Sequence, residues 1–205
     1  MISPYKYYFD PQGNSTAARV TRMVGANKRV LELGCAYGVM SQVLAEVNGC
    51  RILGVEIDAD AAEHAKPFCE RILIANLDTT DWDSLFGDEL FDVIIAADVL
   101  EHLREPGKQL LEMARYLVPG GYMVLSVPNI AHNGVIAEIL SEDFNYRATG
   151  LLDQTHIHFL RCKVWVAHLT RRVWALSNSK KQECQQRVPS SARHGVNFPL
   201  GSPTC

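Results

Sequence analysis

Short runs of apolar residues recur along the chain, and stretches with helical spacing separate them. Five of these runs predict buried strands, at residues 29–33, 51–57, 71–77, 91–97 and 122–129. Apolar residues recur every three or four positions in two stretches that predict amphipathic helices, at 39–47 and 105–118. A shorter helical stretch rich in alanine occupies 59–69. Strands therefore alternate with helices along most of the chain.

This alternation predicts an α/β fold. Buried strands joined by helices form a mainly parallel sheet with helices on both faces, the Rossmann-like, doubly wound arrangement. In such sheets a ligand binds beyond the carboxyl ends of the strands, where the strand order reverses. We expect one such domain over residues 1–160, with its binding site in the loops that follow the strands.

The first of these loops follows the run RVLEL in the segment RVLELGCAYG, residues 29–38. A dinucleotide fingerprint would need glycine at positions 34, 36 and 39, but the chain has Gly34, Ala36 and Val39. The G-K-[ST] element of a phosphate-binding loop is absent as well. The loop therefore matches neither fingerprint. A loop of this kind usually holds a nucleotide-like ligand, and a plain strand-to-helix turn is the alternative.

Polar residues stand where the next strands end. Glu56 closes the second strand about 20 residues after the first loop, where a carboxylate accepts hydrogen bonds from a ribose diol. The third strand ends in Asn76 and Leu77, where an amide and a backbone N–H can meet an adenine edge. Asp98 follows the fourth strand. Each residue alone also fits an ordinary solvated strand end.

Together these segments resemble the class I S-adenosylmethionine-dependent methyltransferases. The resemblance covers about residues 10–163 and rests on LELGCAYG, GVEID, ANLD, FDVIIAADVLEHL and LVPGGYMVLSVPN, in that order. Ala36 departs from the glycine that is usual in the family, and we expect the pocket to tolerate its methyl group.

The resemblance implies that S-adenosyl-L-methionine is the cofactor and assigns a role to each matching residue. Glu32, Gly34 and Gly38 would border its methionine part, and Glu56 would hold the ribose hydroxyls. Ile57 would pack on the adenine, Asn76 and Leu77 would read the adenine edge, and Asp98 would lie near the amino-acid end or the sulfonium.

Methyl transfer to a hydroxyl needs a group that removes a proton. Asp98, His132 and His156 are the candidate catalytic residues, because each lies near the predicted ligand-binding edge or in a later loop that could fold over it. Asp153 and His158 lie in the same later loop as His156. A structural role for each histidine stays open.

A metal-dependent alternative involves the segment DVLEHL and a later histidine. Asp98, Glu101, His102 and His156 resemble the divalent-metal set of some O-methyltransferases that act on quinols or on the terminal ribose of small RNAs. There the metal lowers the pKa of the accepting oxygen. Many methyltransferases with a similar segment need no metal, so we expect a metal-free enzyme.

The chain changes character after about Leu160. Residues 1–160 carry 12 Lys and Arg against 22 Asp and Glu, whereas 161–205 carry 8 against 1. We expect one helix within 163–177 and, from Asn178, a basic disordered tail rich in Pro, Ser, Gly and Gln. The family fold continues with an antiparallel strand pair instead. We therefore expect this pair to be missing and the end to be truncated or frame-shifted.

Composition narrows the remaining possibilities. The acidic body argues against nucleic-acid binding, and no apolar run reaches the length of about 18 residues that a membrane-spanning helix needs. The start of the chain lacks the pattern of a signal peptide, and the six cysteines form no C-x-x-C pair, so we expect a cytoplasmic protein. We expect methyl transfer to a small-molecule acceptor, at oxygen. The alternatives are a cofactor-binding but inactive module and a metal-assisted RNA 2′-O-methyltransferase.

Overall fold

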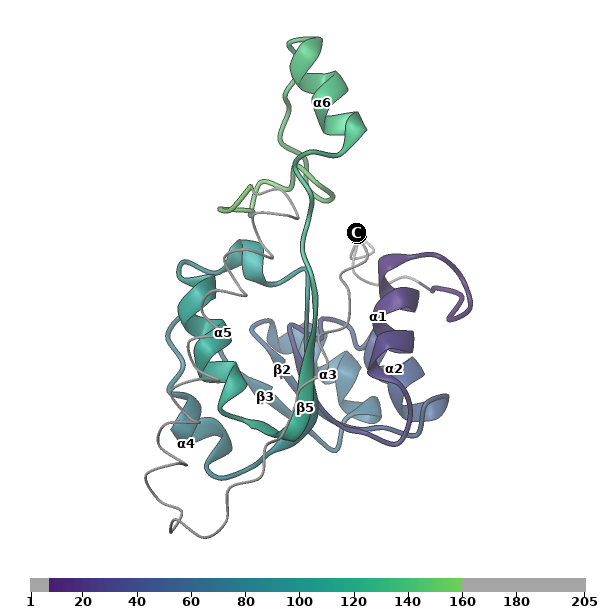
Figure 1. Cartoon of the computed structure of the whole chain (residues 1–205), viewed down its shortest axis with the longest axis vertical. Coiled ribbons are helices and arrows are strands. Elements are labelled where there is room, and N and C mark those ends of the chain that lie inside the picture. The colour runs from purple at the N-terminus through teal and green to yellow at the C-terminus, as the bar shows by residue number, and fades with distance from the viewer. Residues whose placement is uncertain (1–7, 160–205) are drawn as a thin grey trace, which may run out of the picture.

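The computed structural model describes residues 8–159, which form a single parallel sheet with helices on both faces (Figure 1). The strands are β1 (Arg29–Leu33), β2 (Arg51–Glu56), β3 (Arg71–Ile74), β4 (Phe91–Ala97) and β5 (Leu117–Ser126). The α-helices are α1 (Thr16–Val24), α2 (Val39–Glu46), α3 (Ala59–Ala65), α4 (Trp82–Phe86), α5 (Pro106–Ala114) and α6 (Asn133–Leu140). Two single 3-10 turns, η1 (Lys66–Phe68) and η2 (Leu100–His102), complete these elements. The predicted α/β fold class is confirmed.

The strand order places the loops that follow β1, β2 and β4 next to one another. The sheet runs β3-β2-β1-β4-β5, and every neighbouring pair is parallel. β1 lies in the centre, with β2 on one side and β4 on the other. The order reverses between β1 and β4, so the loops after these strands open on the crevice where doubly wound sheets bind ligands.

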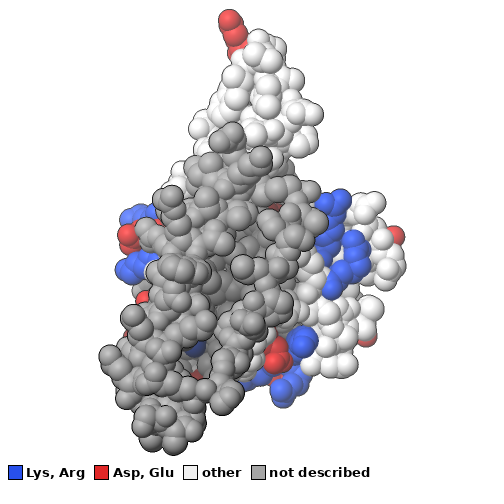
Figure 2. Space-filling view, in the orientation of Figure 1, with Lys and Arg blue, Asp and Glu red and all other residues white. Residues whose placement is uncertain are grey.

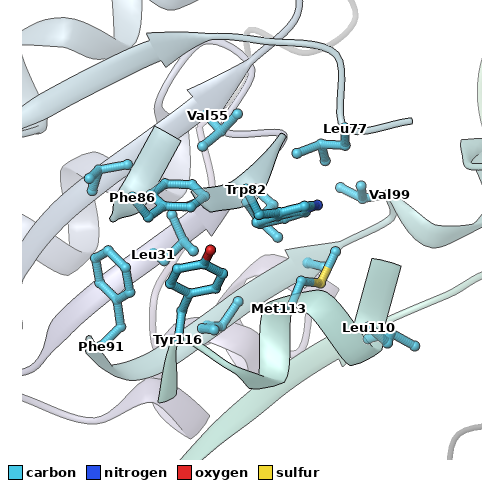
Figure 3. Packing of buried hydrophobic residues seen from close by; sticks show 14 of the residues in the cluster. Leu31, Val55, Leu77, Trp82, Phe86, Phe91, Val99, Leu110, Met113 and Tyr116 are labelled. Carbon is cyan, nitrogen blue, oxygen red and sulfur yellow. The ribbon is translucent and has the colours of Figure 1, made fainter. Parts of the chain in front are cut away.

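Two apolar layers cover the sheet. On one face, Val20 and Val24 of α1 and Leu44 of α2 pack on side chains of β1, β2, β4 and β5. On the other face, α4 and α5 supply an aromatic and aliphatic cluster that includes Trp82, Phe86, Leu110 and Met113 (Figure 3). The indole of Trp82 donates a hydrogen bond to Gln109 Oε1 at 2.8 Å, which satisfies its polar atom inside this layer.

The connection from α5 to β5 differs from the prediction. α5 ends at Ala114 and not at residue 118, and β5 begins at Leu117. Tyr116 is 3% exposed and packs its ring on Trp82 and Phe86, so the chain leaves the helix to bury this side chain. Pro119-Gly-Gly lies inside β5, where the pairing with β4 shifts register between Phe91 and Val93. The predicted helix end at Pro119 is therefore wrong.

Two further helices, α1 and α4, and the projecting α6 have no counterpart in the predicted elements. α1 begins at a Ser15 cap whose hydroxyl accepts from Ala18 N–H at 3.2 Å, and its buried face includes Val20 and Val24. α6 stands away from the sheet beyond the end of β5 (Figure 1). In Figure 2 the protruding part of the molecule that carries α6 shows almost no charged side chains on this face, apart from acidic ones at its tip.

Some expectations concern residues outside the described range. The helix within 163–177, the disordered tail from Asn178 and the missing antiparallel strand pair all fall beyond residue 159. Among residues 8–159, no helix combines the length and the apolar character needed to cross a membrane.

Candidate functional site

A cavity of about 700 Å³ opens at the carboxyl ends of the strands. Its walls come from the carboxyl ends of strands and the loops after them, at 34–37, 55–58, 75–78 and 97–99. The first turns of three helices complete them, with Thr16 and Ala17 of α1, Val39 and Met40 of α2, and Ala61 of α3. His102 and Leu103 close one side of it. The cavity lies at the reversal of strand order, as the sequence predicts. Of the predicted cofactor residues, six line it: Gly34, Glu56, Ile57, Asn76, Leu77 and Asp98.

The loop after β1 depends on glycine at two positions. Gly34 has φ +67°, and a Cβ there would meet Val99 Cγ2 at 2.7 Å. Gly38 has φ +74°, and a Cβ there would meet the Ala65 Cα of α3 at 2.6 Å. Between them Ala36 adopts φ 46°, a left-handed conformation that costs free energy for a residue with a Cβ. The loop is therefore pressed against α3 and the β4 loop, and Gly38 shapes it without lining the cavity.

Glu56 joins the first loop to the second. Its Oε2 accepts from Ala36 N–H at 2.7 Å, and its Oε1 accepts from the N–H groups of Ile57 and Asp58 at 2.8 and 3.0 Å. Only 8% of Glu56 is exposed, and that part borders the cavity. Each carboxylate oxygen can accept more than one hydrogen bond. The same side chain can therefore brace the two loops and still accept a ligand hydroxyl.

The loop after β3 presents an amide and backbone groups to the cavity. Asn76 Oδ1 accepts from Asp78 N–H at 2.9 Å, and Asp78 Oδ1 accepts from Arg104 N–H at 2.9 Å. Leu77 is 8% exposed and belongs to the core cluster under the cavity. Ile57 lies across from this loop and is 63% exposed. These residues offer an apolar surface and a polar edge, as an adenine ring requires.

Glu32 lies behind the loop and not in the cavity wall. The residue has no exposed surface, its Oε2 accepts from Ser41 Oγ at 2.7 Å, and burial raises its pKa to about 7. Desolvation of the charged form explains the direction. Glu32 is therefore buried inside β1 and is not among the residues that line the cavity.

Asp98 lines the cavity at the end of β4 with an unusual backbone. Its φ is 53°, and its Oδ1 accepts from Ser126 Oγ of β5 at 2.8 Å. A left-handed backbone costs free energy for a residue other than glycine, so the surrounding contacts must hold it in place. Such residues are frequent at functional sites. The hydrogen bond to β5 fixes the direction of the carboxylate.

The three predicted catalytic residues do not converge. Only Asp98 lines the cavity. His132 is the N-cap of α6, where its Nδ1 accepts from Gly134 N–H at 3.1 Å, and it is not among the lining residues. The His156 side chain is 6% exposed and lies against η2, with Nε2 3.8 Å from Glu101 Oε1.

Three of the four residues in the metal-dependent alternative come together. One ligand atom from each of Glu101, His102 and His156 lies within 4.8 Å of the others, whereas Asp98 is outside this group. Burial raises the pKa of Glu101 to about 8, and the carboxylates of Asp98 and Asp153 add to the rise. Neither carboxylate oxygen of Glu101 has a hydrogen-bond partner within the described part of the chain. One carboxylate and two imidazoles would suit a divalent cation.

Several lining residues were not predicted. Thr16 and Ala17 reach the cavity because α1 starts there, and the Ser15 cap followed by apolar spacing could have indicated that helix. Tyr37 is another lining residue, and its hydroxyl donates to Asp60 Oδ2 at 3.1 Å. His102 lines the cavity, although the sequence suggested it only as a metal ligand.

Comparisons with known proteins agree with this arrangement. The sequence model of a family described as "Methyltransferase domain" matches residues 12–172. A ubiquinone biosynthesis O-methyltransferase of Coxiella burnetii is 26% identical over 136 residues, which cover 65% of this chain and 58% of that protein. A protein of the same name from Bradyrhizobium is 30% identical over 102 residues, which cover 49% and 40%. The matches thus span 58% and 40% of the length of these two relatives.

Solved structures share the fold at low sequence identity. An S-adenosylmethionine-dependent methyltransferase of Archaeoglobus fulgidus superposes with a TM-score of 0.58 at 18% identity, over 76% of this chain and 66% of that one. The cyclase SpnF superposes with a TM-score of 0.55 at 19% identity, over 81% and 62%. A cyclase with this fold shows that fold alone does not decide the reaction. The family model, the strand-end residues and the sheet topology together show that the chain belongs to the class I S-adenosylmethionine-dependent methyltransferases.

Proposed function

We propose that this protein transfers the methyl group of S-adenosylmethionine to a hydroxyl of a small molecule. The observation that carries the proposal is the cavity at the reversal of strand order, lined by Gly34, Glu56, Asn76 and Asp98. The name shared by the curated relatives, ubiquinone biosynthesis O-methyltransferase, supports oxygen as the accepting atom and a phenolic compound as the acceptor.

In this proposal, different residues around the cavity bind different parts of the cofactor. Glu56 accepts hydrogen bonds from the ribose hydroxyls, while Asn76 and Leu77 contact the adenine edge and Ile57 covers its face. Gly34 permits the close backbone approach that the methionine part needs. Glu32 and Gly38 support that loop from behind. The Asp98 carboxylate attracts the cationic end of the cofactor.

The bound cofactor supplies a methyl group that is already activated on a sulfonium. The chain must therefore align the acceptor oxygen and take up its proton. Asp98 is in the cavity wall for this role, whereas His156 would act from behind His102, and His132 would need α6 to move. The proposal for the catalytic residues thus favours Asp98 and the η2 region over His132.

Calorimetry and a turnover assay test the proposal in two steps. We expect S-adenosylhomocysteine and S-adenosylmethionine to bind and NAD not to bind, and we expect methyl transfer to a soluble catechol. Binding of NAD with no response to the other two ligands would contradict the cofactor assignment. Cofactor binding without transfer to any member of a phenol and catechol library would favour the inactive module, the alternative that leaves the binding site intact.

Metal-assisted transfer is a second candidate, favoured by the convergence of Glu101, His102 and His156. Their side chains would hold the ion, which would lower the pKa of the acceptor hydroxyl when bound. Turnover after chelation, and after Mg²⁺ or Mn²⁺ is restored, tests this candidate. Unchanged rates would rule it out. A short RNA with a free 3′ ribose, tested as acceptor in the same assay, addresses the RNA alternative, which the acidic body does not favour.

A further inference from the structure

The His102 ring is held at one nitrogen by a residue from a distant loop. His102 Nδ1 lies 3.2 Å from the backbone oxygen of Thr155 and 3.2 Å from its Oγ1. The loop itself is fastened to η2, because the N–H groups of Ile157 and His158 donate to the Glu101 carbonyl at 2.9 and 3.2 Å. The position of Thr155 relative to His102 therefore does not depend on their own contact alone.

The proton of the Thr155 hydroxyl is directed away from His102. Thr155 Oγ1 donates to Asp153 Oδ1 at 2.6 Å, and Thr155 N–H donates to the same oxygen at 2.8 Å. Burial would raise the pKa of Asp153, but these two hydrogen bonds and the nearby His156 hold it below its usual value. Asp153 is thus an ionised acceptor, and its preferred donor is the Thr155 hydroxyl.

Two acceptors therefore face His102 Nδ1. The Thr155 carbonyl can only accept, and the Thr155 hydroxyl has given its one proton to Asp153. Nδ1 must then carry the hydrogen, which leaves the lone pair of the neutral ring on Nε2. His102 also lines the cavity together with Asp98, so this lone pair belongs to a side chain of the proposed reaction site.

We propose that Asp153 and Thr155 are positioning residues that hold His102 as the Nδ1–H tautomer, so that His102 Nε2 accepts the hydroxyl proton of the methyl acceptor. This inference rests on the proposed transfer to oxygen and adds a residue, His102, to its catalytic machinery. The acceptor oxygen forms a bond to the methyl carbon while the carbon–sulfur bond breaks. The electron pair of that bond stays on sulfur as a thioether, and the hydroxyl proton moves to Nε2.

Nitrogen NMR tests the positioning without any turnover. We would record long-range ¹H–¹⁵N correlations of the chelator-treated full chain at pH 8 and assign the ring by its loss in His102→Gln. We expect a protonated Nδ1 and an unprotonated Nε2 in the wild type and in Thr155→Ser. Thr155→Val keeps only the backbone carbonyl as acceptor at Nδ1, so we expect a larger fraction of the Nε2–H tautomer in that variant. A wild-type ring protonated at Nε2 would overturn the proposal.

Kinetic measurements with a soluble catechol as acceptor test whether the orientation of His102 supports methyl transfer. Thr155→Val should lower kcat about tenfold, as loss of a residue that orients a functional histidine does, while KM for S-adenosylmethionine stays unchanged. Thr155→Ser should restore kcat, and Thr149→Val, at an exposed threonine of the same region, should match the wild type. His102→Gln should lower kcat by about 10² or more.

Two results would separate this inference from the proposed function. Equal kcat values for Thr155→Val and Thr155→Ser would overturn the catalytic role of the pair even if methyl transfer occurs. If the wild type binds S-adenosylhomocysteine but methylates no acceptor, the proposed function fails. The proton-transfer half of the inference then fails with it, and the NMR result alone decides the tautomer half.

Discussion

Glu56 Oε2 accepts a hydrogen bond from the Ala36 N–H at 2.7 Å, and this contact ties together the loops after β1 and β2. The two residues are 20 positions apart in the sequence. One carboxylate thus sets the spacing of the two loops between which the cofactor would lie. Removal of the side chain would disturb these loop contacts as well as the proposed contact with the cofactor, whereas Glu56→Gln changes the charge at nearly constant shape.

Glu56→Gln should weaken binding of S-adenosylhomocysteine by about 10- to 100-fold, since hydrogen bonds to a charged group contribute about 1.5–3 kcal/mol. The glutamine amide would also point a donor at backbone N–H groups that need an acceptor. Calorimetry measures the change. Glu63→Gln is the matched control, because Glu63 is exposed on α3 and pairs with Lys66 Nζ at the surface, away from the cavity wall. Equal affinity for both variants would contradict the role of Glu56.

Glu32→Gln should change how stability depends on pH. Burial raises the pKa of Glu32 from 4.5 to about 7, so the native state binds more protons than the unfolded state between these values. The contribution of Glu32 to stability is therefore fully present below pH 4.5 and is lost as pH rises through 7, by about 3 kcal/mol in all. Between pH 5 and pH 8, the free energy of unfolding measured with urea should fall less for the variant than for the wild type. Equal falls in unfolding free energy for Glu32→Gln and the wild type would contradict a Glu32 carboxyl that is buried and protonated in the native state.

Ala36→Gly should stabilise the protein by about 1 kcal/mol, because Ala36 has φ 46° and glycine adopts this conformation without the steric cost. Denaturant unfolding measures the gain. Ala137→Gly serves as the opposite control, since Ala137 is exposed within α6 and a helical glycine costs about 0.5–1 kcal/mol. A destabilised Ala36→Gly protein would mean that the methyl group packs favourably in the loop.

Gly38→Ala and Gly25→Ala should differ in stability although both glycines have positive φ, +74° and +78°. A Cβ at Gly38 would lie 2.6 Å from Ala65 Cα, whereas among residues 8–159, chain neighbours aside, no atom lies within 4 Å of a Cβ at Gly25. At Gly25 ψ is −156°, so Gly25→Ala should lose about 1–3 kcal/mol from backbone strain alone. At Gly38 ψ is 21°, so Gly38→Ala should lose about 1–2 kcal/mol from the left-handed backbone and about 1–3 kcal/mol more from crowding. Comparable unfolding midpoints would show that α3 moves aside without cost.

Much of the fold follows from local pattern. The bounds of β1 and β4 agree with the runs at 29–33 and 91–97, because these central strands are buried on both faces and are mainly apolar, although Glu32 and Asp92 are charged residues inside them. The ends of those runs also indicated the cavity, since parallel strands bring their carboxyl ends to one edge. Gly34, Glu56, Asn76 and Asp98 stand at those strand ends and line the cavity, whereas the roles expected of them came from the family resemblance.

Other features depend on contacts between distant segments. Residues 153–158 meet η2 only in three dimensions, and this contact gives His102 its partner and takes His156 out of the cavity wall. His132 follows β5 closely in sequence, yet α6 projects from the sheet and carries His132 as its cap (Figure 1). No periodicity in the sequence encodes either outcome.

The sequence by itself determined the order of the five strands and of the helices α2, α3 and α5, and the chemical types that meet at the sheet edge, because periodicity and strand-end position are local properties of the chain. Tertiary structure alone decided the left-handed backbone of Asp98, the raised pKa values of Glu32 and Glu101, and the hydrogen bonds that orient His102. Burial, strain and hydrogen-bond direction depend on which distant groups surround a residue, and only the packed chain brings those groups together.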